Sequence, residues 1–303
     1  QFHRFAGVYE FALQSDQVNA IDNPDLTAFT PVESEIVNAP VMSGTTSDAH
    51  QDTSISDSDE LSSEETQLDT EPEGITLGSL EDDNLVGGLG SDALFAGGGN
   101  DTLIYLSGAD ILHGGTGFDV ASFEQVSEDP VVLDLGNNQF VVDGDVSQIV
   151  DIESIRGSNQ SDILVGDQND NILYGNDGED TIYGGGGVDH LYGGYGSDVF
   201  QFSSIDDVGL GEGYRDIIFD FDQGTDETTN DMIDLTGLVS SDFSFLDDDS
   251  FTSNGGGAQV RVERSAASSL VEIDLDNDAQ ADAQIELSGN DGVGLNQDDF
   301  VVG

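Results

Sequence analysis

The sequence predicts an all-β protein, in which a right-handed parallel β-roll of nine-residue repeats is followed by a compact C-terminal β domain. Three observations predict this fold. A nine-residue period runs through residues 78–122 and again through residues 157–201. Glycine accounts for 39 of the 303 residues. Strand-like apolar runs, separated by Gly, Asn and Asp, follow the second repeat block.

The chain begins with residues 1–77, which are predicted to be an N-terminal segment and an acidic, flexible linker. Residues 1–14 are rich in aromatic side chains, whereas residues 15–74 contain fifteen acidic residues and no Lys or Arg. Such a composition buries too little apolar surface to offset the entropy lost on ordering. The alternative is a segment that becomes ordered on a partner or on calcium.

The first repeat block, residues 78–122, and the second, residues 157–201, each hold five nine-residue units in one register. Position six is Asp in nine units and Asn171 in the tenth. Position eight is Leu, Ile or Phe, with Ala121 as the exception. The last three positions therefore predict a short strand with one inward apolar side chain. Two units predict one turn of a roll, and successive turns stack as parallel strands.

The first six positions of the unit are rich in glycine and end in Asp. Glycine permits positive φ, so the backbone turns tightly and directs carbonyl oxygens inward. Carbonyls and carboxylates are the hard oxygen ligands that calcium prefers, about six to eight of them at about 2.3–2.6 Å. The turn of each unit therefore predicts calcium binding.

The unit pattern GGxGxDxUx, in which U is a large apolar residue, resembles the repeat of RTX (repeats-in-toxin) proteins. The best matches are residues 87–95, 184–192 and 193–201. The resemblance implies a parallel β-roll with calcium held between the loops of successive turns. It implies side-chain ligands at position six, which are Asp83, Asp92, Asp101, Asp110, Asp119, Asp162, Asp180, Asp189 and Asp198, with Asn171 as a weaker ligand. It also implies carbonyl ligands at Gly87, Gly88, Gly90, Gly184, Gly185, Gly187, Gly193, Gly194 and Gly196.

The number of calcium ions follows from the pairing of loops. A site needs two loops on the same edge of the roll, which come from units i and i+2. Each block of five units then offers three pairs, so six ions is the ceiling for the repeats. Units 78–86, 105–113 and 166–174 lack glycines that the pattern requires. Some of the sites are therefore predicted to be weak or missing.

Two further regions complete the fold. Residues 123–156 contain alternating apolar runs, such as 131–135 and 140–142, and are predicted to be intervening strands. The period stops after residue 201, and residues 202–303 hold strand-like runs at 216–219 and 259–262 among Gly, Asn and Asp clusters. This last region is predicted to be a compact β domain with its own core.

The C-terminal region carries a second resemblance. Residues 196–238 resemble the C-terminal domain of serralysin-type secreted proteases, which implies a further calcium at Asp207 and Asp216. The final residues 299–302, Asp-Phe-Val-Val, resemble the acid-plus-three-apolar signal that type I (ABC) exporters read. Gly303 follows them, which departs from that signal. The resemblance implies an extracellular protein, either secreted or at the cell surface.

Charge and missing motifs exclude several classes of function. The chain has 63 Asp and Glu against 5 Lys and Arg, a formal charge of −58, which argues against nucleic acid and anionic membranes as partners. It has no Cys, and no apolar run approaches a membrane span. No H-E-x-x-H, G-x-S-x-G or G-x-G-x-x-G motif occurs, so no catalytic or nucleotide-binding residue is predicted and the protein is not expected to be an enzyme.

Two sequence features leave alternatives open. Asp274, Asp276, Asp278 and Asp282 resemble the start of an EF-hand loop, but its sixth position is Ala279. A solvated turn is favoured, with a calcium site as the alternative.

Tyr174, Tyr183 and Tyr192 all occupy position nine and point outward. Tyr174 and Tyr192 are expected to stack on one sheet, with Tyr183 on the other. Packing against neighbouring segments is favoured over a docking strip for a glycan or another protein.

The sequence thus predicts a non-enzymatic, extracellular calcium-binding protein with a structural, adhesive or carrier role. Repulsion among the negative charges is expected to hold the calcium-free chain open, so calcium binding contributes folding free energy. Extracellular calcium modules have a Kd of about 10⁻⁴–10⁻³ M, which predicts an unfolded chain in the cell and a folded one outside. The alternative is the C-terminal calcium-binding and secretion module of a larger exoenzyme, such as a protease, lipase or polysaccharide-modifying enzyme.

Overall fold

A computed structural model of the chain describes residues 74–223, 230–240, 242–253, 256–265, 267–289 and 295–303. Residues 1–73, which hold the predicted N-terminal segment and most of the acidic linker, lie outside the described residues. The described residues form β-strands and two short 3-10 helices, η3 (Ile205–Asp207) and η4 (Gln297–Asp299), without an α-helix among them. None of their helices is long and apolar enough to cross a membrane.

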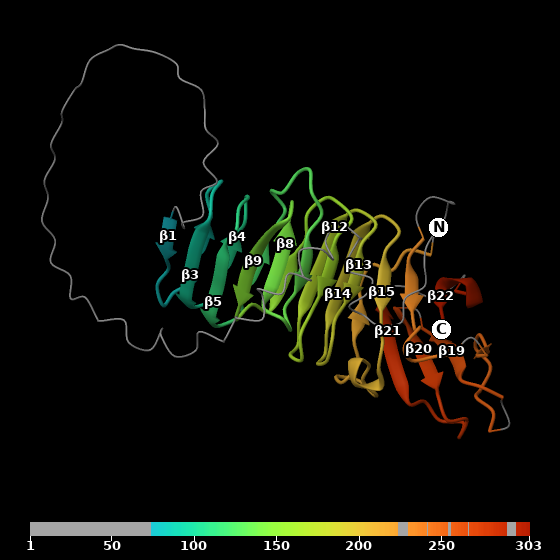
Figure 1. The fold of residues 1–303 in the computed structure, drawn as a ribbon. Helices are drawn as coiled ribbons and strands as arrows, with labels where there is room; N and C mark the ends of the chain where they lie inside the picture. Colours follow the sequence, from blue (N-terminus) through green and yellow to red (C-terminus); the bar gives the residue numbers. More distant parts are fainter. Residues whose placement is uncertain (1–73, 224–229, 241, 254–255, 266, 290–294) are drawn as a thin grey trace, which may run out of the picture. The chain divides into compact units, whose positions relative to one another are not determined.

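The strands form two sheets of eleven strands each (Figure 1). Sheet A contains, in spatial order, β1 (Gly74–Leu77), β3 (Asp92–Gly98), β5 (Ile111–Thr116), β9 (Asp145–Val150), β8 (Gln139–Val142), β7 (Val132–Asp134), β11 (Ile163–Val165), β13 (Thr181–Tyr183), β15 (Val199–Gln201), β17 (Met232–Asp234) and β22 (Phe300–Val301). Sheet B contains β18 (Ser244–Phe245), β19 (Gln259–Arg264), β20 (Ser268–Asp274), β21 (Ala283–Ser288), β16 (Ile217–Ile218), β14 (His190–Tyr195), β12 (Ile172–Asp177), β10 (Ser154–Arg156), β6 (Val120–Ser122), β4 (Thr102–Ile104) and β2 (Asn84–Val86).

Successive units of the repeat alternate between the two sheets, and the pairing is parallel. Leu85 of β2 pairs with Leu103 of β4, and Leu164 of β11 pairs with Ile182 of β13. Each of these steps is 18 residues, which equals two nine-residue units. The predicted parallel roll with two units per turn is therefore confirmed.

The core lies between the sheets and is built from position eight of each unit. Leu85 is 7% exposed, and the other nine position-eight residues, Ala121 included, are 0% exposed. Three buried aromatic rings from outside position eight, those of Tyr105, Phe123 and Phe140, contact one another with centroids 4.9–5.4 Å apart. Single apolar residues at nine-residue spacing thus assemble one continuous core, because the roll stacks them on one another.

The intervening segment adds three strands to sheet A and one strand to sheet B. In sheet A, β7, β8 and β9 form an antiparallel meander between β5 and β11. In sheet B, β10 alone stands between β6 and β12, and it pairs in parallel with both. Sheet B therefore runs through the interruption without a break in its parallel ladder, a point that matters for the sites at its edge.

The C-terminal region differs from the expected compact domain with its own core. β16 and β21 continue sheet B, and β17 and β22 continue sheet A. Buried residues such as Ile218, Ile285 and Phe300 belong to the same hydrophobic cluster as the repeat residues. The physical reason is that an open roll exposes the apolar ends of its two sheets, and these strands cover them.

The outward tyrosines lie as the sequence predicts. The rings of Tyr174 on β12 and Tyr192 on β14 stack with centroids 4.4 Å apart and an interplanar angle of 18°. Phe219 stacks on the other face of Tyr192 at 4.7 Å, and the Arg156 guanidinium lies over Tyr174 at 5.5 Å. Tyr183 lies on β13 of the other sheet. The described contacts are with neighbouring strands, which supports the packing interpretation.

Candidate metal sites

Oxygen-bearing side chains form two rows, one at the edge of each sheet where the strands begin. Row B is defined as the residues that directly precede β2, β4, β6, β10, β12, β14 and β16, namely Asp83, Asp101, Asp119, Glu153, Asn171, Asp189 and Asp216. Row A is defined as the residues that precede or begin β3, β5, β11, β13, β15 and β17, namely Asp92, Asp110, Asp162, Asp180, Asp198 and Asp231. All ten predicted position-six residues lie in these rows.

One carboxylate oxygen of most row members is used to link turns. The backbone N–H of Asp101 donates to Oδ1 of Asp119 at 2.8 Å, and the N–H of Asp162 donates to Oδ1 of Asp180 at 2.7 Å. The same bond joins Asp189 to Asp216 at 2.8 Å. The carboxylate therefore satisfies a backbone donor that the short strands leave unpaired at their beginning.

The second carboxylate oxygen of seven row members is buried and has no hydrogen-bond partner. These atoms are Oδ2 of Asp101, Asp110, Asp119, Asp180, Asp189, Asp198 and Asp216. The seven side chains are at most 1% exposed. An ionised carboxylate in such a place costs several kcal/mol unless a positive charge or a donor meets it. These oxygens are therefore open to a cation.

Burial raises the pKa of carboxyl groups in both rows. It raises the pKa of Asp180 and Asp216 to about 8, and that of Asp110 and Asp189 to about 7. It raises the pKa of Asp198 to about 6. Loss of solvation is the largest cause in each case, and neighbouring carboxylates add to it. Without a cation, the fold therefore favours the protonated form of these groups.

Glycine leaves room beside the open oxygens. A Cβ built at Gly175 would collide with Oδ2 of Asp180 and would lie 2.5 Å from the carbonyl oxygen of Gly193, one turn further on. A carboxylate oxygen and a carbonyl oxygen from successive turns thus face the same space, which a side chain would fill. Together with the unpartnered oxygens, this donor set fits calcium, a hard cation that takes carboxylate and carbonyl ligands.

Four other predicted ligands already accept a hydrogen bond from a backbone N–H group of their own turn. Asp83 accepts from the N–H of Ser79 at 2.6 Å, and Asp92 from the N–H of Gly88 at 2.5 Å. Asp162 accepts from the N–H of Ser158 at 2.6 Å, and Asn171 from the N–H of Asp167 at 2.8 Å. All four begin a block or lie in its second unit. Their role as metal ligands stays a prediction.

In the predicted pair Asp207 and Asp216, only one residue keeps an oxygen without a hydrogen-bond partner. Asp207 lies in η3, where Oδ2 accepts from the N–H groups of Ser203 and Ser204 at 2.9 and 2.6 Å. Asp216 keeps an unpartnered Oδ2 and has no exposed surface. Of the two, Asp216 offers the open oxygen, and a shared calcium stays a prediction.

Three further acidic residues belong to the site region although the nine-residue period does not contain them. Oε2 of Glu153 accepts from the N–H of Asp119 at 2.8 Å, and Oδ1 of Asp231 accepts from the N–H of Asp198 at 2.9 Å. Asp220 accepts from the N–H groups of Gly193 and Gly194 at 2.9 and 3.0 Å. Glu153 and Asp231 could have been found from a local signal, because each is an acid followed by x-U-x, as at the end of a repeat unit.

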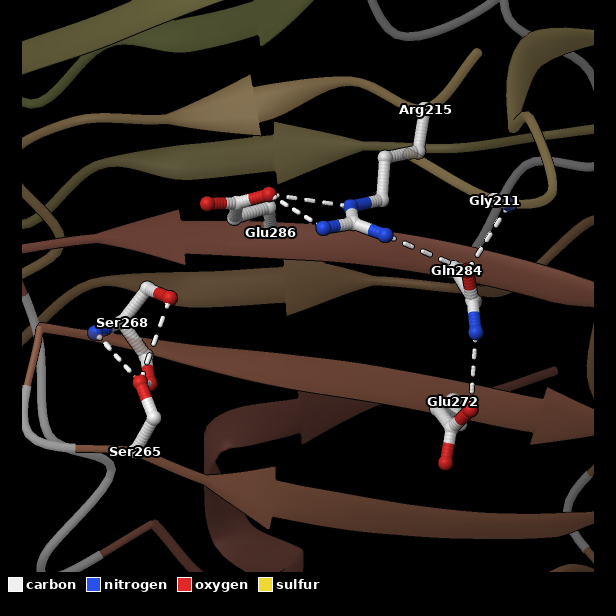
Figure 2. A network of polar contacts seen from close by, with 7 residues as sticks. All are labelled: Gly211, Arg215, Ser265, Ser268, Glu272, Gln284 and Glu286. Atoms are coloured by element: carbon white, nitrogen blue, oxygen red, sulfur yellow. Dashed lines mark hydrogen bonds and ion pairs between the residues drawn. The ribbon is translucent and has the colours of Figure 1, made fainter. Parts of the chain in front are cut away.

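A polar network anchors the segment that carries Asp216, the last member of row B (Figure 2). Arg215 donates from Nε and Nη2 to Oε2 of Glu286 on β21, at 3.0 and 2.6 Å. The N–H of Gly211 donates to Oε1 of Gln284 at 2.8 Å, and Gln284 donates to Glu272 on β20 at 2.8 Å. The network therefore ties the approach to Asp216 to the two C-terminal strands.

The EF-hand-like segment forms the turn between β20 and β21. Carboxylate oxygens of Asp274, Asp276 and Asp282 lie within 4.8 Å of one another. Asp274 is buried, and its two oxygens accept from the N–H groups of Asn277 at 2.7 Å and Ala279 at 3.0 Å. The turn thus uses Asp274 to close itself, and a calcium ion there stays the alternative.

Comparison with known proteins identifies the repeat. The chain matches the family model of the RTX calcium-binding nonapeptide repeat in four copies, over residues 77–112, 105–121, 156–191 and 165–200. No curated protein matches the chain.

Solved structures with similarity to the chain include two subunits of the Azotobacter vinelandii mannuronan C5-epimerase. AlgE6R3 is 22% identical, with 77% of this chain and 85% of that chain covered and a TM-score of 0.26. AlgE6R2 is 19% identical, with 77% and 94% covered and a TM-score of 0.28. The extracellular lipase LipA from Serratia marcescens is 18% identical, with 76% of this chain and 40% of that chain covered and a TM-score of 0.25.

Proposed function

We propose that this chain, whose two blocks are RTX calcium-binding nonapeptide repeats, is an extracellular calcium-binding protein that folds on calcium after type I secretion. Its role is structural, adhesive or that of a carrier. The observation that supports the proposal most directly is the set of buried Oδ2 atoms without partners in rows A and B. They are distributed along both edges of the roll, so the whole fold depends on how their charge is met.

The chain's own residues divide the work of binding. Oδ1 of an Asp such as Asp180 joins two turns through a backbone N–H, and Oδ2 is held toward the space left by Gly175. The carbonyl of Gly193 faces that space from the next turn. Bound calcium supplies the positive charge that offsets the buried carboxylates and the net charge of −58.

The magnitude of this binding is large enough to decide folding. At a calcium concentration ten times the Kd, one site adds roughly 1.4 kcal/mol to the free energy of unfolding. Several such sites add a total comparable with the whole stability of a domain, which is about 5–15 kcal/mol. Calcium at the millimolar level found outside cells therefore favours the folded chain, and low cytosolic calcium does not.

The position of the C-terminal residues agrees with export before folding. Asp299 and Phe300 are 4% and 6% exposed, and β22 pairs with β17. Val301 and Val302 are only partly buried. The first half of a signal in residues 299–302 would therefore be hidden in the folded protein, whereas all of it would be accessible in the unfolded chain.

A secretion assay tests this part of the proposal. The chain is expressed with a type I exporter at low and at millimolar external calcium, and a variant lacking residues 299–303 is compared with an Asp298→Asn variant as control. We expect the truncated chain to stay in the cells and the control to be exported. Equal export of the truncated chain would contradict the type I assignment.

The alternative of a calcium-binding and secretion module in a larger exoenzyme stays a prediction. The mass of the native secreted product distinguishes the two, because a product much larger than 31.9 kDa favours the exoenzyme.

A further inference from the structure

The break between the two repeat blocks coincides with an unexplained buried oxygen. Asp119 is the position-six residue of the last unit in the first block, so no repeat unit follows it one turn on. Its Oδ2 is nevertheless fully buried and without a partner, like those inside the blocks. Inside the second block, Oδ2 of Asp180 faces the carbonyl of Gly193 from the next turn.

The backbone carbonyl of Asp151 lies where a repeat unit would place the carbonyl ligand of the next turn. A Cβ built at Gly114 would collide with the carbonyl oxygen of Asp151 and would lie 2.5 Å from Oδ2 of Asp119. Gly175 faces the carbonyl of Gly193 and Oδ2 of Asp180 in the same manner. The side chain of Asp151 is directed elsewhere, since its Oδ2 lies 3.5 Å from Nε2 of His113.

Glu153 takes the place of the next position-six Asp. Its Oε2 accepts from the N–H of Asp119 at 2.8 Å, the bond that an Asp Oδ1 accepts elsewhere in the row. Inside a block, position six comes five residues after position one, whereas Glu153 comes two residues after Asp151. Asp151 adopts a φ of 51°, which turns the backbone within this short segment. The longer side chain of Glu153 thus reaches the N–H of Asp119 although the segment before it is shorter than a repeat loop.

We propose that Asp119 Oδ2 and the Asp151 carbonyl, with the Glu153 carboxylate beside them, form a calcium site at the junction of the two blocks. The inference rests on the proposed calcium binding and adds a site that contains no second repeat unit. Row B would then bind calcium across the interruption, which links the two blocks into one calcium-dependent structure.

Asp151 and Glu153 also face a cavity of about 120 Å³, whose lining includes Asp167 and Asn169. The three acidic residues in this lining favour a cation nearby.

The first test measures bound calcium per chain on the full-length protein, by equilibrium dialysis with metal analysis. Glu153→Gln keeps an acceptor for the N–H of Asp119 and removes only the charge. We expect this variant to lose one calcium per chain, or to bind it at least tenfold more weakly. Glu128→Gln, an exposed acid of the same intervening segment, is the matched control and should bind as the wild type does. Unchanged stoichiometry and affinity in Glu153→Gln would overturn the proposal.

The second test does not depend on a variant folding. Crystals of the wild-type chain grown with calcium are measured for anomalous scattering. We expect a peak within about 2.3–2.6 Å of Asp119 Oδ2 and the Asp151 carbonyl oxygen. Peaks beside Asp180 with none at Asp119 would overturn the junction site and leave the proposed function intact. A wild-type chain that binds no calcium in either measurement would overturn both.

Discussion

The backbone N–H of Asp162 donates to Oδ1 of Asp180, 2.7 Å away and one full turn further along the roll. Oδ2 of the same Asp180 is buried and has no partner. One carboxylate is thus divided between two tasks, since one oxygen joins the turns and the other is left for a cation. This division repeats along both rows, and it makes the fold depend on what meets the second oxygen.

Replacing Asp180 with Asn should have opposite effects with and without calcium. Asn keeps an oxygen for the N–H of Asp162 and removes the buried charge. Because burial raises the pKa of Asp180 from 3.8 to about 8, the group is mostly protonated in the calcium-free fold at pH 7, and taking up that proton costs at most about 4 kcal/mol. An unpartnered amide N–H costs about 1–3 kcal/mol in return. We expect the calcium-free variant to be more stable than the wild type by on the order of 1–3 kcal/mol.

In calcium, the same Asp180→Asn variant should need about tenfold more calcium to reach half folding, because one charged ligand is lost. Circular dichroism in chelator measures the folded fraction without calcium, and a calcium titration of the same signal measures the second effect. Glu128→Gln, which removes an exposed acid outside the repeat units, is the control and should change neither value by much. A variant that loses stability equally in both conditions would show that Oδ2 of Asp180 has no part in calcium binding.

The stability of the calcium-free protein should fall as the pH rises. The pKa values of Asp180, Asp189 and Asp198 are raised by burial to about 8, 7 and 6. Between the ordinary Asp pKa and these values, the folded state binds more protons than the unfolded state does. Their contribution to stability is therefore present at about pH 4 and is lost as the pH rises to about 8.

Calcium should reverse this dependence, because protons compete with it for the same oxygens. We expect the calcium-induced rise in Tm to be largest at about pH 8 and to shrink as the pH falls toward about 5. Thermal melts of resin-depleted and calcium-loaded protein across this range measure the effect. A calcium-free protein whose Tm increases from about pH 5 to about pH 8 would contradict the role of the buried carboxyl groups.

A methyl group at Gly175 should block a site without removing any ligand. In Gly175→Ala, the added carbon would fill the space between Oδ2 of Asp180 and the carbonyl of Gly193. We expect about one calcium fewer per chain and a destabilisation of about 1–3 kcal/mol from overpacking. Gly256→Ala is the control, because a Cβ there meets nothing within 4 Å. Calcium stoichiometry equal to wild type in Gly175→Ala would place the ion elsewhere.

The aromatic stack on sheet B should contribute to stability. Tyr192 stacks on Tyr174 at 4.4 Å and on Phe219 at 4.7 Å, so Tyr192→Ala removes two ring pairs. We expect a loss of about 1–3 kcal/mol in the free energy of unfolding in calcium. Tyr195→Ala, at a residue that is 82% exposed, should change it by less than about 0.5 kcal/mol. Equal stability of the two variants would favour the alternative that this face serves to dock a partner.

The repeat made most of the fold predictable. The nine-residue period fixes which side chain faces inward, so the amino-acid sequence alone assigns Leu164 and Ile182 to the core and to neighbouring turns. The same period places Asp162 and Asp180 at one edge. Repetition carries this information because each unit contacts copies of itself.

Residues outside the period could not be placed in the same way. Glu153 joins row B through a shortened loop, and Asp231 joins row A 33 residues after Asp198. Their places depend on the course of irregular segments, which a repeat does not determine. The closure of Asp207 by the capping box of η3 was likewise not visible in its spacing. The merging of the C-terminal strands with both sheets follows from covering the open end of the roll, a tertiary effect.

We expect calcium to fold the roll through its two rows of carboxylates. Far-UV circular dichroism of the purified chain during a calcium titration, with magnesium as control, measures this folding. We predict a cooperative transition from coil to β structure at sub-millimolar to millimolar calcium, and none with magnesium. A spectrum that is already fully β in chelator at neutral pH would contradict this expectation, because the unpartnered carboxylates would then not govern folding.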